Sequence, residues 1–182
     1  TTTSAMAAHV LRAGGIKPSH YVGAEIPILG TNARWDTDGS FFVAEGDESD
    51  GTLVSYHPEH AIVLNIEPEH LDYYKDLQAI DAVFTKLLAQ TAGIVFYCGD
   101  DAGARRVCET HVGSISYGHG ETCFYQIQNL RTENFRSQFS VLRGGTELGR
   151  ISLNIPGAHN ALNALAVVAL ATEIAIPFEK IV

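Results

Sequence analysis

Short apolar runs recur along the chain, and each one ends in polar or glycine-containing residues. Residues 41–44, 60–66 and 94–98 are such runs, and residues 113–117 are predicted to form a fourth strand. Continuous apolar runs of this length are typical of parallel strands that are buried on both faces. A short extended piece at residues 20–23 precedes them. The pattern predicts a mostly parallel sheet.

Segments with helical spacing alternate with these strands. Between residues 76 and 90, apolar residues recur at the spacing of an amphipathic helix. Residues 5–13 and 102–110 are predicted to be helices as well. Residues 159–174 are rich in Ala and Leu and apolar nearly all round, which predicts a buried helix. Strands that alternate with helices indicate an α/β fold, with a mostly parallel sheet flanked by helices.

The alternation of predicted strands and helices stops after residue 121. Residues 122–128, 137–142 and 147–153 are three extended pieces, and the Arg-Gly-Gly-Thr stretch at 143–146 is a hairpin signal. We therefore expect a small antiparallel three-stranded sheet inserted near residues 121–154.

Composition narrows the class of protein. With 182 residues and 46% hydrophobic side chains, the chain can bury the core of one sizeable domain. Its net charge of -9 argues against nucleic acid or an anionic membrane surface as a partner, because both require basic faces. Cys98, Cys108 and Cys123 lack metal-ligand spacing, so free thiols in a reducing cytoplasm are expected. No apolar run reaches the roughly 20 residues of a membrane span.

Both ends of the chain have the sequence expected where a longer protein has been divided. The chain opens with Thr1, Thr2 and Thr3, directly before the first predicted helix, and it closes just after Pro177, which is typical of a helix start. We expect residues 1–182 to be a middle domain with sequence missing on both sides. The threonines fit either a plain N-cap run or hydroxyl groups at a helix N-terminus that faces phosphate.

Acidic residues follow the first apolar run directly. Glu45, Asp47, Glu48 and Asp50 lie within six residues, and Gly46 is the only glycine among them. Carboxylates at this density repel one another unless water or a cation lies among them. A solvated acidic loop and a divalent-metal site are both open interpretations.

Polar residues also follow the second apolar run. The sequence Asn-Ile-Glu-Pro-Glu-His-Leu-Asp at 65–72 includes Asn65 and His70. Ligands of open α/β sheets bind beyond the carboxyl ends of the strands, so we expect these residues and Glu45 to face one edge of one sheet. His70 fits a ligand for metal or substrate, and a solvated surface histidine is the alternative.

A turn precedes the last long helix and places two amides at its start. Pro156 and Gly157 make the turn, and His159, Asn160 and Asn163 follow. Asn160 and Asn163 are three residues apart, so their side chains share a helix face. Paired amides can bind a planar heterocycle such as adenine. N-capping by Asn160 is the alternative, but it leaves Asn163 unexplained.

Four motifs together resemble the ATP-dependent Mur ligases over essentially the whole chain. The opening Thr-Thr-Thr-Ser is similar to the end of that family's phosphate loop. Glu-Gly-Asp-Glu-Ser-Asp at 45–50, the 65–72 motif and Pro-Gly-Ala-His-Asn-Ala-Leu-Asn at 156–163 are similar to its central-domain motifs, in the family's order. The resemblance implies a P-loop-type sheet and a single central ATPase domain, and a Gly-rich loop ending in Lys is expected upstream.

The resemblance also implies roles for individual residues. Thr1 and Thr2 would bind the phosphates of ATP, and Thr1 and Glu45 would be Mg²⁺ ligands. His70 would hold a second Mg²⁺, so that Glu45 and His70 carry the catalysis. The adenine pocket would be lined by His159, Asn160 and Asn163. Contacts to the other substrates would come from Ser49, Asp50 and Asn65.

Within the family, the chain is most similar to the branch that joins L-alanine to UDP-N-acetylmuramate through an acyl phosphate. This implies a cytoplasmic bacterial enzyme of peptidoglycan precursor synthesis, whose isolated central domain is inactive. Murein peptide ligase, which adds a tripeptide to the same nucleotide sugar, is the nearest alternative. A phosphate-loop binding or switch module that forms no amide is a further alternative.

Overall fold

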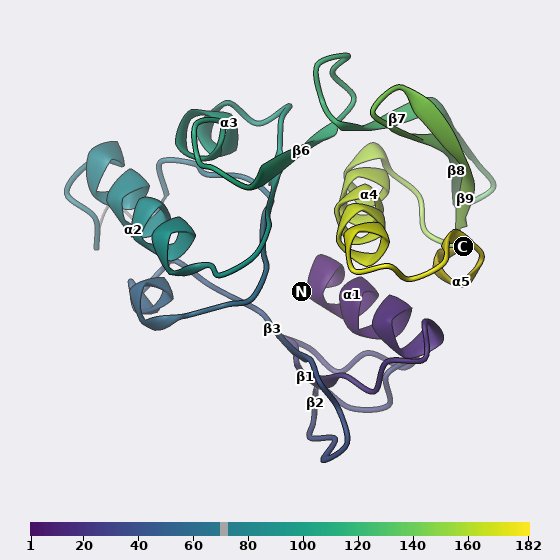
Figure 1. Ribbon diagram of the computed structural model, residues 1–182, viewed down its shortest axis with the longest axis horizontal. Coiled ribbons are helices and arrows are strands. Elements are labelled where there is room, and N and C mark those ends of the chain that lie inside the picture. The colour runs from purple at the N-terminus through teal and green to yellow at the C-terminus, as the bar shows by residue number, and fades with distance from the viewer. Residues whose placement is uncertain (70–72) are drawn as a thin grey trace. The chain divides into compact units, whose positions relative to one another are not determined.

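The computed structural model describes residues 1–69 and 73–182, and its internal contacts divide the chain into two compact units (Figure 1). Unit 1 comprises Thr1–Glu45 and Ile127–Val182, and unit 2 comprises Gly46–Gln126. The α/β character predicted from the hydrophobic pattern is confirmed, with strands and helices alternating along much of the chain.

Unit 2 contains the parallel part of the sheet. Its strands are β4 (Ala61–Val63), β5 (Val95–Cys98), β6 (Ser114–Gly118) and the start of β7 (Tyr125–Glu133). β4 pairs with β5, β5 with β6, and β6 with the first residues of β7, all in parallel. All four residues of β5 are buried, as expected for a central parallel strand. The predicted strands at 60–66, 94–98 and 113–117 are thus confirmed, with shorter bounds.

Two helices pack against this sheet within unit 2. They are α2 (Leu77–Gln90) and α3 (Ala102–Cys108), and a short 3₁₀ turn, η1 (Thr52–Ser55), contacts α2. Asp76 caps α2 by accepting a hydrogen bond of 2.9 Å from the Ala79 amide. Ile80 and Phe84 of α2 share one core with Val63 and Val95 of the strands. The amphipathic pattern therefore placed the buried face of α2 correctly.

Two long helices form the centre of unit 1. α1 (Thr2–Ala13) packs against α4 (Ala158–Glu173), and a short α5 (Phe178–Ile181) contacts both. α4 buries eight residues, including the run from Ala164 to Ala169, so the predicted burial of this helix is confirmed. Pro177 precedes α5, as the sequence indicated.

A small three-stranded sheet lies beside α1 in unit 1. Its strands are β1 (Ser19–Tyr21), β2 (Ala33–Arg34) and β3 (Phe42–Ala44), in the order β2-β1-β3. β3 is parallel to β1, and β2 is antiparallel to it. Val43 packs with Ala5, Ala8 and Val22, whereas Phe42 is 58% exposed.

Two expectations about β3 are therefore corrected. The run at 41–44 is parallel, as predicted, but it is only partly buried, on the face where α1 covers Val43. β3 also takes β1 as its hydrogen-bonded neighbour, whereas β4 belongs to the other sheet. The expectation that Glu45 and Asn65 follow strands of one sheet is wrong for this reason.

The predicted extended pieces after residue 121 are confirmed as β7, β8 (Arg136–Arg143) and β9 (Thr146–Leu153). β8 and β9 form an antiparallel hairpin, and Gly144 and Gly145 supply the positive φ angles of 54° and 82° that its turn requires. A second tight turn, at Asn134 and Phe135, has positive φ angles of 50° and 61° and was not predicted. The strand order β4-β5-β6-β7-β8-β9 shows that these strands continue the parallel sheet through β7.

The three cysteines are free and buried. Burial raises the pKa of the Cys108 thiol to about 12 and that of the Cys123 thiol to about 11. Both thiols therefore stay protonated and unreactive at neutral pH. Among the residues that the structure describes, no helix is long and apolar enough to cross a membrane.

Candidate functional site

The start of α1 and the end of β3 bring Thr1 and Glu45 together in unit 1. The Thr1 hydroxyl donates a hydrogen bond of 2.7 Å to Glu45 Oε1, and the Gly23 amide donates one of 2.7 Å to Glu45 Oε2. The Thr1 amino group lies 3.0 Å from the same Oε1. Both oxygens of the carboxylate are thus held in place. Thr1, Gly23 and Glu45 are hereafter called the Glu45 cluster.

Backbone pairing positions this cluster. Tyr21 lies opposite Ala44 in the parallel β1 and β3 strands, and the Glu45 amide donates to the Tyr21 carbonyl at 3.1 Å. Gly23 and Glu45 therefore leave the sheet side by side. A Cβ at Gly23 would lie 2.8 Å from Thr1 Oγ1 and 2.9 Å from Glu45 Oε1, so only glycine fits without displacement. Sequence reasoning missed Gly23, although a glycine just after a strand can signal such a close approach.

The threonines at the start of α1 differ in their surroundings. Thr1 is the N-cap residue, but its side chain makes no capping hydrogen bond and turns to Glu45 instead. The interpretation of a plain N-cap run is thus contradicted for Thr1. Thr2 is exposed in the first turn, and Thr3 is buried. The hydroxyl groups of Thr1 and Thr2 are therefore the two that a ligand can reach.

The Glu45 carboxyl group is ionised at neutral pH. Burial acts to raise its pKa, but the hydrogen bonds from the Gly23 amide and the Thr1 hydroxyl, together with the amino group of Thr1, hold the pKa below its usual value. The contributions of the Gly23 amide and the Thr1 hydroxyl do not depend on a free amino group. The side chain of Glu45 is 26% exposed. A charged carboxylate that is partly open to solvent suits a cation ligand.

The spacing of the oxygen atoms fits a magnesium ion. Thr1 Oγ1 and Glu45 Oε1 are 2.7 Å apart. Neighbouring ligands on an octahedral ion with bonds of about 2.1 Å lie about 3 Å apart, so a small shift would let both oxygens bind one ion. Hydroxyl and carboxylate oxygens are the ligand types that Mg²⁺ accepts. The Thr1 hydroxyl would then turn a lone pair, instead of its proton, toward the site.

The protein ligands around Glu45 are few. Within residues 1–69 and 73–182, no group of three or more His, Cys, Asp or Glu side chains could hold a metal ion. Mg²⁺ is commonly bound by one or two carboxylates, with water and substrate phosphates completing its coordination. The Glu45 cluster matches that kind of site better than a closed structural metal site.

The two asparagine side chains predicted to bind adenine, Asn160 and Asn163, lie at the start of α4 in unit 1. Gly157, at a φ of 105°, is the N-cap residue, so the alternative of capping by Asn160 is contradicted. Asn160 Nδ2 instead donates a hydrogen bond of 2.7 Å to the Pro156 carbonyl. His159 is exposed, and Asn160 and Asn163 are half-buried. The turn thus fixes the Asn160 amide at the first turn of the helix.

The acidic turn that follows Glu45, in unit 2, is held by hydrogen bonds between its own residues. Asp47 Oδ1 accepts from the Ser49 amide at 2.7 Å, and Asp50 Oδ1 accepts from the Thr52 amide at 2.9 Å. The bond from the Thr52 amide is the largest influence on the Asp50 carboxyl, whose pKa is lowered. Asp47 and Asp50 therefore shape the turn.

The polar stretch after β4 is anchored by a residue that sequence reasoning missed. Asp101 Oδ1 accepts from the Ala104 amide at 2.6 Å, which caps α3, and from the Ile66 amide at 3.1 Å. Asn65, next to Ile66, donates to Glu67 Oε1 at 3.3 Å. An Asp just before a helix was the available signal. His70 lies outside the described residues.

Comparison with known proteins decides the family. A sequence model of the Mur ligase middle domain matches residues 1–171. The chain belongs to the Mur ligase family. This Mur ligase chain is 38% identical over 185 residues to a UDP-N-acetylmuramate–L-alanine ligase of Syntrophotalea carbinolica, a match that covers 100% of the chain and 40% of the relative. The chain thus spans about two fifths of the length of such relatives.

Two solved Mur ligases have the same fold as the chain. A UDP-N-acetylmuramate–alanine ligase from Thermotoga maritima superposes with a TM-score of 0.88 at 26% identity, over 100% of this chain and 40% of that one. The UDP-N-acetylmuramate:L-alanyl-γ-D-glutamyl-meso-diaminopimelate ligase from Neisseria meningitides gives 0.87 at 27% identity, over 100% and 60%. The resemblance inferred from the four motifs is confirmed at the level of the family and fold.

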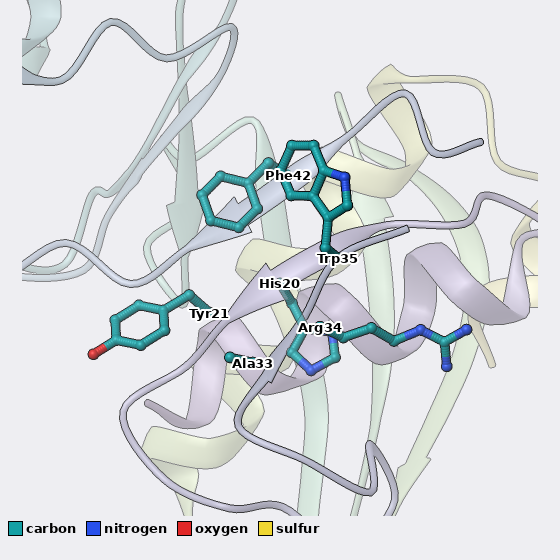
Figure 2. Close-up of a pocket in the computed structure, with 6 residues that line it drawn as sticks. All are labelled: His20, Tyr21, Ala33, Arg34, Trp35 and Phe42. Atoms are coloured by element: carbon teal, nitrogen blue, oxygen red, sulfur yellow. The ribbon is translucent and has the colours of Figure 1, made fainter. Parts of the chain in front are cut away.

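One feature of this Mur ligase chain lies outside the four motifs. A pocket of about 350 Å³ in unit 1 is lined by His20, Tyr21, Ala33, Arg34, Trp35 and Phe42. Figure 2 shows the Trp35 and Phe42 rings next to each other, with centroids 6.2 Å apart, while the Tyr21 ring points away from them. None of the candidate catalytic, metal, cofactor or substrate residues predicted from the sequence lines it. The exposed ring of Phe42 was missed because the run at 41–44 was expected to be buried.

Proposed function

We propose that the chain is the central, ATP-binding domain of a ligase that joins L-alanine to UDP-N-acetylmuramate. The observation that carries this proposal is the 38% identity over the whole chain to a ligase named for that reaction. Because the chain spans 40% of that relative, the complete activity belongs to a longer polypeptide, here called the full-length ligase. Residues 1–182 are proposed to act as one domain of it.

The reaction requires activation of a carboxylate. A carboxylate is a poor electrophile, so the γ-phosphoryl group of ATP is first transferred to one of its oxygens, which gives an acyl phosphate and ADP. The amine of L-alanine then attacks the carbonyl carbon, phosphate leaves, and a base takes the proton of the amine. Phosphoryl transfer of this kind depends mainly on positioning and on neutralising charge.

The Glu45 cluster is proposed to hold the magnesium ion. Glu45 and the Thr1 hydroxyl supply two oxygens within 2.7 Å of each other, and the Gly23 amide orients the carboxylate. Mg²⁺, when bound, neutralises charge on the phosphates. Thr2, exposed in the first turn of α1, is proposed to contact a phosphate oxygen near the positive end of the helix dipole. His70 is proposed to hold a second ion.

The start of α4 is proposed to bind adenine. Asn160 uses its amide nitrogen for the Pro156 carbonyl, so its carbonyl oxygen is the atom offered to the amino group of adenine. Asn163 lies one turn further along the same helix, and His159 is exposed beside them. Ser49, Asp50 and Asn65 are proposed to contact the remaining substrates.

Charge supports a cation-dependent mechanism. The chain carries a net charge of -9, and ATP and the nucleotide sugar are both anionic. A protein of this charge repels such ligands unless cations lie between them. The composition thus supports the proposed cation requirement, as the Glu45 cluster does.

The proposal is tested with the full-length ligase, ATP, Mg²⁺ and UDP-N-acetylmuramate. Phosphate release is expected to depend on added L-alanine, with the L-alanyl product visible by mass spectrometry. The tripeptide L-alanyl-γ-D-glutamyl-meso-diaminopimelate is the control amine, and little turnover is expected with it. We also expect the 182-residue chain by itself to form no product.

Two other outcomes would contradict this proposal. Turnover with the tripeptide and little with L-alanine would identify a murein peptide ligase, which the TM-score of 0.87 to the Neisseria enzyme favours as the second candidate. ATP binding without any effect of the nucleotide sugar on hydrolysis would indicate a binding or switch module. The cytoplasmic location stays a prediction.

A further inference from the structure

The acidic turn at residues 47–52 is tied to the core of unit 2 by a buried tyrosine. The hydroxyl of Tyr74 donates a hydrogen bond to the Glu48 carbonyl, and the Gly51 amide donates to the same carbonyl at 3.0 Å. Tyr74 is only 4% exposed and belongs to the hydrophobic core that α2 shares with β4 and β5. The Glu48 carbonyl thus accepts one hydrogen bond from within the turn and one from the core.

The neighbouring tyrosine, Tyr73, lies next to Gly51 of the turn. The rings of Tyr73 and Tyr74 meet edge to face, with centroids 4.9 Å apart. Gly51 has a φ of 71°, and a Cβ there would lie 2.8 Å from the Tyr73 hydroxyl oxygen. The left-handed backbone conformation therefore favours glycine at this position, where the Tyr73 hydroxyl also lies close.

Two further hydrogen bonds described for the turn are local. Asp47 bonds the Ser49 amide, and Asp50 bonds the Thr52 amide, each two residues along the chain. Local bonds of this kind are open to competition by water, whereas a hydroxyl held in a core is fixed by its packing. The Tyr74 hydroxyl therefore links the middle of the turn, next to Ser49, to the core, while Leu53 holds the end of the turn by packing in the same core.

The protonation of Tyr74 suits this role. Burial, followed by the nearby Tyr73 hydroxyl and the carboxylates of Glu48 and Asp50, raises the pKa of Tyr74. The phenol therefore keeps its proton across the neutral range and remains a donor.

We propose that Tyr74 is a positioning residue, which holds the 47–52 turn so that Ser49 and Asp50 meet a substrate other than ATP. The proposal rests on the proposed function, because it takes the ligase reaction as its readout. The carboxylates of Asp47 and Asp50 would repel the phosphates of ATP unless a cation lay between them, and the ion proposed for ATP is assigned to Glu45, so this turn is assigned to the other substrates. The nucleotide sugar and the amino acid offer hydroxyl and amino groups that an ionised carboxylate can accept from.

The test compares Tyr74→Phe with Tyr117→Phe. Tyr117 is a matched control, because it is also a buried tyrosine of unit 2 whose hydroxyl donates to a backbone carbonyl, that of Val63, at 3.3 Å. In the full-length ligase, Tyr74→Phe is expected to raise KM about tenfold for UDP-N-acetylmuramate or L-alanine, the effect of losing one hydrogen bond. The values of kcat and of KM for ATP should stay within about twofold.

A second readout needs no catalysis. In the 182-residue chain, NMR order parameters of residues 49–52 are expected to fall from about 0.85 toward 0.6 in Tyr74→Phe and to stay unchanged in Tyr117→Phe. Unchanged order parameters would overturn the proposal, as would a looser turn with all KM values unchanged, or equal KM changes in both variants. If the wild-type ligase forms no amide, the proposed function fails, and the order parameters alone decide whether Tyr74 holds the turn.

Discussion

Replacing Glu45 with glutamine is expected to lower kcat/KM of the full-length ligase about 100-fold or more. Loss of groups that merely orient metal ligands costs 10- to 100-fold, so loss of a proposed ligand should cost at least as much. Glutamine retains the size of the side chain and can still accept from the Gly23 amide, but it removes the negative charge that a cation requires. Phosphate release as a function of Mg²⁺ concentration measures the effect, and the variant should need more Mg²⁺.

Glu25 provides the control for this experiment. It is an exposed carboxylate in the same unit, two residues after Gly23. Glu25→Gln removes the same charge without touching the Glu45 cluster, so wild-type rates are expected. Wild-type activity in Glu45→Gln, or an equal loss in both variants, would rule out Glu45 as the metal ligand.

Gly103→Ala is expected to lower the free energy of unfolding of the chain by about 3 kcal/mol or more. Gly103 lies in α3, where an added Cβ would come within 1.9 Å of the Ile66 carbonyl oxygen. Either α3 or the 65–67 stretch must move, and the bond from the Ile66 amide to Asp101 is then lost. Urea unfolding followed by circular dichroism measures the change.

The sign of this effect is diagnostic. Alanine is favoured over glycine inside a helix by about 1 kcal/mol, so helix propensity alone predicts stabilisation. Gly113→Ala is the matched control, because its φ is +89° but its nearest neighbour is 3.7 Å away. It should cost only about 1 kcal/mol for the left-handed backbone. A Gly103→Ala variant as stable as the wild type would show that α3 does not press against Ile66 as described.

Local patterns predicted most of the elements. The amphipathic spacing at 76–90 gave α2 and its buried face, and the Asp76 cap fixed its start. The apolar run at 94–98 gave the buried strand β5, and the glycine pair at 144–145 gave the β8–β9 turn. In each case the signal and the structure that it produces lie within a few residues of each other.

The misses have physical causes that lie beyond local patterns. β2 is only two residues long and exposed, so it has no hydrophobic pattern to detect. The turn at Asn134 and Phe135 places an aromatic residue at a φ of 61°, where glycine is the usual signal. The exposure of Phe42 depends on which face α1 covers, and an apolar run cannot show that.

The candidate site was predicted in part. Thr1 and Glu45 were singled out from sequence positions 44 residues apart, and the structure joins them by a hydrogen bond. Gly23 donates its backbone amide to Glu45, and Asp101 accepts from the backbone amide of Ile66. Residue type alone does not reveal such bonds to the backbone. The sequence left Asp47 and Asp50 open between a solvated loop and a metal site, and their hydrogen bonds show that they shape the turn.

The position of a divalent ion in the full-length ligase is the most direct test of the account. With a non-hydrolysable ATP analogue, Mn²⁺ in place of Mg²⁺ broadens NMR signals of nuclei close to it, and Mg²⁺ serves as the diamagnetic control. We expect the Gly23 and Thr2 amide signals to be lost in the wild type and to return in Glu45→Gln. Sharp Gly23 and Thr2 signals in the Mn²⁺-loaded wild type would contradict the assignment of the Glu45 cluster as the metal site.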